Sequence, residues 1–233
     1  MIEVAGKTAL IVGVGVGLSA SLARTFTKAG MKVALAARRG GELGALAAET
    51  GGKAFTCDAT NRAEVVTLFS EVEAGLGALD AVVYNASYRT RGPFVALEPS
   101  EVERSLMVTA FGGFLVAQEA AKRMVPRAHG AILFTGASAS VKGYAQSAPF
   151  AMGKFALRGM AQSMARELAP QGIHVAHVVI DGGIRSKRRS DPADRPDSTL
   201  DPDAIAQSYL DLLQQERSAW AWEIELRPWV EKF

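Results

Sequence analysis

Cysteine, histidine and long hydrophobic runs are scarce in this sequence of 233 residues, and each scarcity excludes a class of protein. Because Cys57 is the only cysteine, an internal disulfide is impossible, and the chain fits a reducing compartment. The three histidines lack partners at zinc-ligand spacing, and we expect His174 and His177 on a buried strand or its rim. The longest uncharged stretch, Thr8–Ala23, has 16 residues interrupted by glycines, which is too short for a membrane-spanning helix. We therefore expect a cytoplasmic protein without a membrane segment or a metal site.

An excess of charge of one sign is also missing. The 26 basic and 24 acidic residues leave a formal net charge of +2, which argues against a general nucleic-acid binder, because such a protein needs a concentrated basic face. Apolar residues make up 48% of the chain and charged residues 21%, as in ordinary globular proteins. A chain of this length can bury a core of its own but is short for two domains.

Apolar runs of strand length alternate with longer helical stretches along most of the chain. The runs are rich in Val, Ile, Leu and Ala and do not alternate with polar residues, as expected for parallel strands covered on both faces. The expected buried strands are Thr8–Val12, Lys32–Ala37, Lys53–Cys57, Ala81–Asn85, Ala131–Thr135 and His174–Ile180, and a last strand is expected around Trp222–Leu226. The pattern predicts a single-domain α/β fold over residues 1–233, doubly wound and Rossmann-like, with a seven-stranded parallel sheet flanked by helices on both faces.

Several helices have recognisable starts. Asn61 with Glu64, and Ser100 with Glu103, have the spacing of a capping box. Asp201–Pro202 supplies a cap followed by a proline in the first turn of a helix.

The segment 185–200 (RSKRRSDPADRPDSTL) interrupts this regular pattern. It is polar, contains proline and has no periodicity, which predicts a loop or a mobile lid. Its arginines either attract an anion or only keep the loop soluble.

Three glycines follow the first predicted strand. Gly13, Gly15 and Gly17 stand at alternate positions just before a helix, so the backbone can turn sharply and approach a diphosphate. The start of the helix adds free N–H donors and the positive end of a dipole. A plain strand–helix turn is the alternative, but the place of the glycines after the first strand of a βαβ unit favours nucleotide binding.

Polar residues also follow the next three strands. Arg38 and Arg39 end the second strand, where a dinucleotide presents its adenosine ribose. An acidic residue there would bind the 2′-hydroxyl of NAD, whereas a guanidinium pairs with the 2′-phosphate of NADP, so NADP(H) is favoured over NAD(H). Asp58 and Asn85 end the third and fourth strands, where an adenine and a ribose would lie, although either side chain could instead cap a turn.

Together these motifs resemble the short-chain dehydrogenase/reductase family over nearly the whole chain. The family's Thr-Gly-x-x-x-Gly-x-Gly motif is similar to Val12-Gly13-x-x-x-Gly17-Leu18-Ser19, and its Asn-Ala-Gly motif to Asn85-Ala86-Ser87. Its Asp after the third strand looks like Asp58, and its Pro-Gly segment looks like Asp181-Gly182. The resemblance implies that the cofactor is contacted by Gly13, Gly15, Val16, Gly17, Leu18, Arg38, Asp58, Asn85, Lys154, Gly182, Ile184 and Ser186.

The catalytic residues that the resemblance implies are mostly replaced. The family's Tyr-x-x-x-Lys pair falls on Phe150 and Lys154, its Ser on Ala137 and its Asn on Thr109, so only Lys154 is retained. In the family the tyrosine hydroxyl carries the proton and the serine holds the reacting oxygen, which a phenyl ring and a methyl group cannot do. Ser138, Tyr144 and Ser147 are nearby hydroxyls, although Ser138 could cap a turn and Tyr144 could pack on the loop.

Three functions are compatible with these observations. The first is an NADP(H)-dependent oxidoreductase that transfers hydride to or from a small carbonyl, alcohol or enone substrate with a non-standard proton donor. The second is a catalytically inactive protein that senses NADP(H). The third is a structural partner subunit, and in each case we expect a homo-dimer or homo-tetramer, as in the family.

Overall fold

The computed structural model describes residues 3–186 and 189–231 of the chain. Its centre is a seven-stranded sheet in the order β3-β2-β1-β4-β5-β6-β9, and every neighbouring pair is parallel. The strands are β1 (Thr8–Val12), β2 (Lys32–Ala37), β3 (Lys53–Thr56), β4 (Leu79–Tyr84), β5 (Gly130–Thr135), β6 (Ile173–Ile180) and β9 (Glu223–Leu226). The predicted doubly wound, Rossmann-like fold is therefore confirmed, with strand ends within two residues of those expected.

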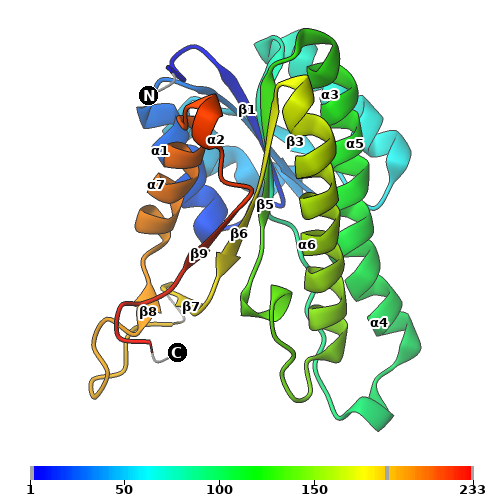
Figure 1. Cartoon of the computed structure of the whole chain (residues 1–233), viewed down its shortest axis with the longest axis vertical. Helices are drawn as coiled ribbons and strands as arrows, with labels where there is room; N and C mark the ends of the chain where they lie inside the picture. Colours follow the sequence, from blue (N-terminus) through cyan, green and yellow to red (C-terminus); the bar gives the residue numbers. More distant parts are fainter. Residues whose placement is uncertain (1–2, 187–188, 232–233) are drawn as a thin grey trace.

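Helices cover both faces of this sheet (Figure 1). One layer holds α1 (Leu18–Lys28), α2 (Gly44–Thr50) and α7 (Pro202–Leu213), and the other holds α3 (Arg62–Leu76), α5 (Gly112–Met124) and α6 (Ala148–Leu168), with α4 (Pro99–Leu106) beside α6. Shorter helical turns are η1 (Gly40–Leu43), η2 (Phe94–Ala96), the π-helical η3 (Met107–Phe111), η4 (Val125–Arg127), η5 (Ser138–Ser140), η6 (Ala169–Gln171) and η7 (Arg217–Ala219). Each described helix is too short or too polar to cross a bilayer.

Apolar residues at helical spacing hold the first layer to the sheet. Leu18, Leu22 and Phe26 lie four residues apart on α1, and all three are buried. Burying one such side chain stabilises the fold by about 1.5–3 kcal/mol. The helix ends where Gly30 adopts a positive φ of 84°, a conformation that glycine reaches without steric cost.

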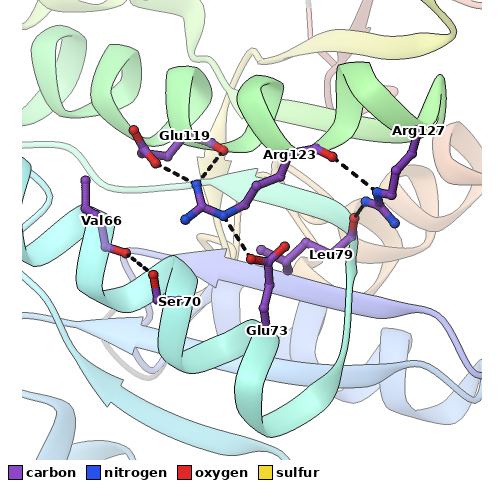
Figure 2. A network of polar contacts seen from close by, with 7 residues as sticks. All are labelled: Val66, Ser70, Glu73, Leu79, Glu119, Arg123 and Arg127. Carbon is purple, nitrogen blue, oxygen red and sulfur yellow. Dashed lines mark hydrogen bonds and ion pairs between the residues drawn. The ribbon is translucent and has the colours of Figure 1, made fainter.

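An arginine joins two helices of the second layer (Figure 2). Arg123 on α5 donates to Glu73 of α3 at 3.0 Å and to Glu119 at 2.6 Å. Its guanidinium carbon also lies 5.1 Å from the centre of the Phe69 ring. Arg127 continues the network to the carbonyl of Leu79, which follows α3 in the chain. These contacts fix the α3–α5 pair over the sheet.

Two local expectations are wrong and two are confirmed. Asp201 caps α7, because its side chain accepts from the Asp203 amide, and Pro202 is the first residue of that helix. Asn61 caps α3, because its side chain accepts from the Ala63 and Glu64 amides. Ser100 does not cap α4, which starts one residue earlier at Pro99, because proline favours the first helical position and Glu98 takes the cap position. The strand expected to be buried at residues 53–57 is β3, which is mostly exposed because it lies at the edge of the sheet.

The segment 185–200 is more structured than a plain loop. Two short strands, β7 (Gly183–Ile184) and β8 (Thr199–Leu200), pair at its base. Asp191 accepts from the amide and hydroxyl of Thr199, and Arg185 pairs with Asp191 at 3.2 Å and Asp201 at 3.3 Å. Residues 187–188 of this segment lie outside the described residues.

Candidate functional site

A cavity of about 740 Å³ opens at the carboxyl edge of the strands on the β1–β2–β4 side of the sheet. Its size suits a small-molecule or cofactor site. Six residues predicted from the sequence to contact a cofactor line it, namely Gly13, Gly15, Val16, Arg38, Asp58 and Asn85. The loops that follow four different strands therefore meet at one place, as expected at the switch point of a parallel sheet.

The glycine turn between β1 and α1 forms one wall of this cavity. Gly13 has a φ of 88°, and a Cβ there would lie 2.5 Å from the Cα of Ala86, so only glycine fits. A Cβ on Gly15 or Gly17 would meet nothing within 4 Å. The first glycine is thus required by packing, whereas the later two leave open space beside the backbone, which suits a bound diphosphate.

Two polar side chains hold this turn in place, and the sequence reasoning missed their pairing. The buried Ser19 hydroxyl donates to the Gly13 carbonyl at 3.0 Å and accepts from Asn85 Nδ2 at 2.6 Å. The backbone N–H of Asn85 also donates to the Val12 carbonyl at 2.9 Å. Asn85 therefore joins the end of β4 to the glycine turn and still lines the cavity.

The two arginines after β2 differ in their contacts. Arg39 forms an ion pair with Glu42 at 3.2 Å. Arg38 is exposed, lines the cavity and has no ion pair or side-chain hydrogen bond within residues 3–186 and 189–231. Arg38 is thus the guanidinium that can meet an anionic group in the cavity.

Asp58 both caps a turn and lines the cavity. Its Oδ1 accepts from the amide and the hydroxyl of Thr60, at 2.9 and 2.8 Å. Its own amide donates to Glu64 at 2.8 Å, which ties the end of β3 to the first turn of α3. The two interpretations that the sequence left open for this residue are compatible.

Lys154 lies away from this cavity, inside the second layer. Its side chain is 3% exposed, and Nζ donates to the Thr135 carbonyl at the end of β5 at 2.6 Å. Burial lowers the pKa of Lys154 to about 8. The lysine is therefore buried, with its ammonium held by a backbone carbonyl.

Three positions surround the end of α6 that carries Lys154. The half-buried Phe150 ring has the ammonium of Lys154 at 5.7 Å and the guanidinium carbon of Arg89 at 4.9 Å from its centre. Thr109 is buried in η3, and its hydroxyl accepts from the Tyr88 amide at 3.2 Å. Ala137 presents a methyl group, and its amide donates to Ser140 at 3.1 Å. A phenyl ring and a methyl group carry no proton to exchange.

The neighbouring hydroxyls have different surroundings. Burial alone would raise the pKa of Asp181, but hydrogen bonds from Ser138 and Lys142 outweigh it and lower that pKa, so Ser138 is engaged by this carboxylate. Tyr144 is 47% exposed in the loop before α6. Ser147 is buried, and its hydroxyl has no hydrogen-bond partner among the described residues.

The remaining predicted cofactor residues lie outside the main cavity. Gly17 and Leu18 are the cap and the first residue of α1, and Leu18 is buried. Gly182 is exposed after β6, Ile184 belongs to β7, and Ser186 pairs with Arg189 through the backbone. The cavity thus collects the residues expected at the adenosine and diphosphate end, and their cofactor contacts stay a prediction.

Comparison with known proteins identifies the family to which this site belongs. A family model described as short chain dehydrogenase matches residues 7–193. The chain belongs to the short-chain dehydrogenase family. It is similar to the crystal structure of a short-chain dehydrogenase from Rhodopseudomonas palustris, with 34% identity, a TM-score of 0.84, and coverage of 96% of this chain and 99% of that one.

Two further relatives show the range of the likeness. A metagenomic short-chain oxidoreductase solved in complex with NADP is 25% identical with a TM-score of 0.83, over 97% of this chain and 99% of that one. The (21S)-21-acetoxyl-apo-melianone synthase of Melia azedarach is 33% identical over 175 residues. That match covers 73% of this chain and 64% of the synthase, so the chain spans less than two thirds of that relative.

Proposed function

We propose that this short-chain dehydrogenase is an NADP(H)-dependent oxidoreductase that acts on a small carbonyl, alcohol or enone substrate with a non-standard proton donor. The observation that carries the cofactor choice is Arg38, which is exposed at the cavity and unpaired among the described residues. A guanidinium there can pair with a ribose 2′-phosphate through charge-assisted hydrogen bonds. The similar oxidoreductase solved with NADP supports the same choice.

The residues present fit a dinucleotide. Beside Gly15 and Gly17 there is space that a Cβ would enter without contact, and the amino end of α1 follows directly. The Ser19–Asn85 pair keeps this backbone in position before any ligand arrives. When bound, the nicotinamide supplies or accepts the hydride. Lys154 is our candidate for the nicotinamide ribose hydroxyls, after its ammonium leaves the Thr135 carbonyl.

The proton must come from a group other than residue 150. Phe150 has no exchangeable proton, and Ala137 cannot donate to a developing oxyanion. Tyr144, which is partly exposed beside α6, and Ser138, which contacts Asp181, are the candidate donors on this chain. We propose one of these hydroxyls or water as the proton source.

Fluorescence titration with NADPH and NADH tests the cofactor assignment. Replacing Arg38→Gln should weaken NADPH binding about 10- to 100-fold, because a charge-assisted hydrogen bond is lost, and should change NADH binding no more than about twofold. Arg39→Gln is the matched control, since that guanidinium pairs with Glu42. If neither coenzyme binds at micromolar to low-millimolar concentration, the proposal is wrong. Turnover is then measured with a panel of carbonyl and enone compounds.

An inactive NADP(H) sensor is the second candidate. It is favoured by the side chains at positions 109, 137 and 150, which stand where the resemblance implies the family's catalytic Asn, Ser and Tyr. Saturable NADPH binding without turnover above the free-solution rate, over the whole panel, would support the sensor. Turnover by the unaltered protein would refute it.

We also propose self-association, either alone or as the basis of a structural subunit. Four large apolar side chains on η3, α5 and α6 are exposed, namely Phe111, Phe114, Met152 and Phe155. Phe111 and Phe114 stack with ring centres 6.0 Å apart. An exposed apolar patch of this kind suits a homo-dimer or homo-tetramer, and finding only a monomer by light scattering would count against it.

Two further expectations remain proposals. We propose that segment 185–200 opens and closes as a lid, with the Asp191–Thr199 bonds as its closed state. We also propose a cytoplasmic location, because a single cysteine excludes an internal disulfide and so fits a reducing compartment.

A further inference from the structure

Three arginines from two separate segments lie near one another, and one of them, Arg89, lies beside the Phe150 ring. The guanidinium carbon of Arg89, in the loop between β4 and α4, lies 4.9 Å from the centre of that ring. Arg91 follows two residues later in the same loop. Arg189, from segment 185–200, lies over β7, because a Cβ built on Gly183 would come within 3.0 Å of its Cδ and Nη1. All three arginines are exposed to solvent.

These three charges repel one another and are not neutralised. Partial burial lowers the pKa of Arg89, and the nearby Arg91 and Arg189 lower it further. Among residues 3–186 and 189–231, none of the three side chains forms an ion pair. Two cations near Arg189 in the chain or the sheet differ, since Lys142 pairs with Asp181 at 3.3 Å and Arg185 pairs with two carboxylates.

The loop that carries Arg89 and Arg91 is anchored on both sides. The Tyr88 amide donates to the Thr109 hydroxyl at 3.2 Å, and the Tyr88 carbonyl accepts from Ser105 at 3.0 Å. The Gly92 amide donates to the Gln146 carbonyl at 3.1 Å, which joins this loop to the one before α6. The backbone therefore holds Arg89 beside Phe150, and Arg91 close to it in the same loop, despite their mutual repulsion.

A bound anion is the simplest way to relieve this repulsion. An arginine fork matches the two oxygens of a carboxylate or phosphate, and a partly desolvated guanidinium binds such a group more strongly than one in bulk water. Arg89 adjoins the α6 turn that carries Phe150 and Lys154, so an anion bound at Arg89 would lie next to the reacting end of a substrate. The arginine cluster is separate from Arg38, which lines the adenosine end of the cavity.

We propose that Arg89, Arg91 and Arg189 bind an anionic group of the substrate, so that the substrate class is a carbonyl compound bearing a carboxylate or a phosphate. This proposal rests on the oxidoreductase function proposed above, from which it takes the carbonyl. Thr109, at the position of the family's Asn, then acts as a positioning residue, because its hydroxyl holds the backbone next to Arg89.

Matched pairs of probes with and without the charge test the substrate class. NADPH oxidation is followed with benzoylformate against its methyl ester, and with dihydroxyacetone phosphate against dihydroxyacetone. We expect kcat/KM to be about 10- to 100-fold higher for the charged member of one pair, because one or two charge-assisted hydrogen bonds are gained. The pair that shows this preference identifies the carboxylate or the phosphate as the anion.

Arginine variants assign the effect to the cluster. Arg91→Gln and Arg189→Gln should each lower the charged-to-neutral ratio about tenfold through a higher KM, while kcat for the neutral probe stays within about twofold. Arg89→Lys, which keeps the charge but loses the fork, should lower the ratio less than Arg89→Gln. Arg166→Gln is the control, because Arg166 is exposed near the far end of α6. A ratio that no cluster variant changes would overturn the proposal.

A binding measurement separates this proposal from the one on which it rests. Calorimetry with benzoylformate and with inorganic phosphate, on the full chain with and without NADPH, needs no turnover. Binding that Arg189→Gln weakens about tenfold supports the anion site even if NADPH fails to bind. Normal NADPH binding and turnover, with no anion binding by calorimetry and equal use of the charged and neutral probes, would refute the anion site alone.

Discussion

The glycine turn between β1 and α1 and the first turns of α6 lie at the same edge of the sheet but differ in how their polar groups are arranged. At the glycine turn, Ser19 and Asn85 hold the backbone, and the space beside Gly15 and the guanidinium of Arg38 stay open. At α6, the Lys154 ammonium is bound to a carbonyl, and the Phe150 ring lies beside it, at the position where we expect the family's proton carrier. One end is ready for a ligand, whereas the other must rearrange or use another donor.

This difference shows that cofactor binding and proton transfer depend on separate parts of the scaffold. The glycine turn depends on backbone packing of Gly13 against Ala86, which tolerates no side chain. At the α6 end, Phe150 and Lys154 are side chains four residues apart on one face of a regular helix, and the helical backbone itself does not require these two residue types. Replacing residues at the α6 end therefore need not disturb the glycine turn.

The largest effect is expected from restoring the family's hydroxyls at the α6 end. Phe150→Tyr combined with Ala137→Ser should raise the turnover of a carbonyl probe by about 100- to 10,000-fold, because a positioned proton donor contributes this much. Phe155→Tyr, on the exposed side of α6, is the control and should leave the turnover of the carbonyl probe unchanged. The measurement is NADPH oxidation at saturating coenzyme. No gain would mean that the two ends differ in more than these two side chains.

Adding a methyl group to the glycine turn should have the next largest effect. Gly13→Ala should lower the free energy of unfolding by about 2–5 kcal/mol, since a positive φ and a clash with Ala86 are both imposed. Gly15→Ala is the matched control, because its Cβ meets nothing, and its unfolding should be unchanged while NADPH binding weakens. Urea unfolding and fluorescence titration measure the two effects. Equal stability loss in both variants would contradict the packing argument.

The buried lysine should make stability depend on pH. The pKa of Lys154 is about 8 in the folded protein and 10.5 as its ordinary value, so between these values only the unfolded chain holds the proton. The free energy of unfolding of the unaltered protein, measured relative to that of the Lys154→Met variant, should therefore rise by about 3 kcal/mol as the pH increases from 8 to 10.5. Lys28→Met, on the exposed end of α1, is the control. Urea unfolding across this pH range measures the difference in unfolding free energy between the two proteins. A difference that falls as the pH rises would contradict the prediction.

The smallest effect is expected at the clamp on the glycine turn. Ser19→Ala and Asn85→Ala should each cost about 1–2 kcal/mol of unfolding free energy, because each leaves a buried polar partner unsatisfied. The double variant should cost less than the two single losses added together, by about 0.5–1.5 kcal/mol, since both remove the same hydrogen bond. Strict additivity in urea unfolding would show that the pair does not act as a clamp.

Much of the architecture was predictable because parallel strands covered on both faces leave long apolar runs in the sequence. The expected strands agree with the structure to within two residues, and Asn61 caps its helix as predicted. The sequence pattern gave the wrong helix start where more than one residue could occupy the cap position. Glu98 and Pro99 start α4 although Ser100 has the better capping-box spacing. The exposure of β3 was missed because the sequence does not say which strand lies at the edge.

The sequence by itself determined the order of strands and helices, the glycine turn and the absence of a side-chain hydroxyl at positions 137 and 150, because these follow from residue identity and local spacing. Only the tertiary structure decided which arginines are free. Arg38 and Arg39 are neighbours, yet Arg39 pairs with Glu42, whereas Arg38 forms no ion pair with any residue that the structure describes. Arg89 and Arg189 are 100 positions apart and come together only when the sheet brings both segments to one edge. Charge pairing acts through space over a few ångströms, so distance along the chain does not reveal it.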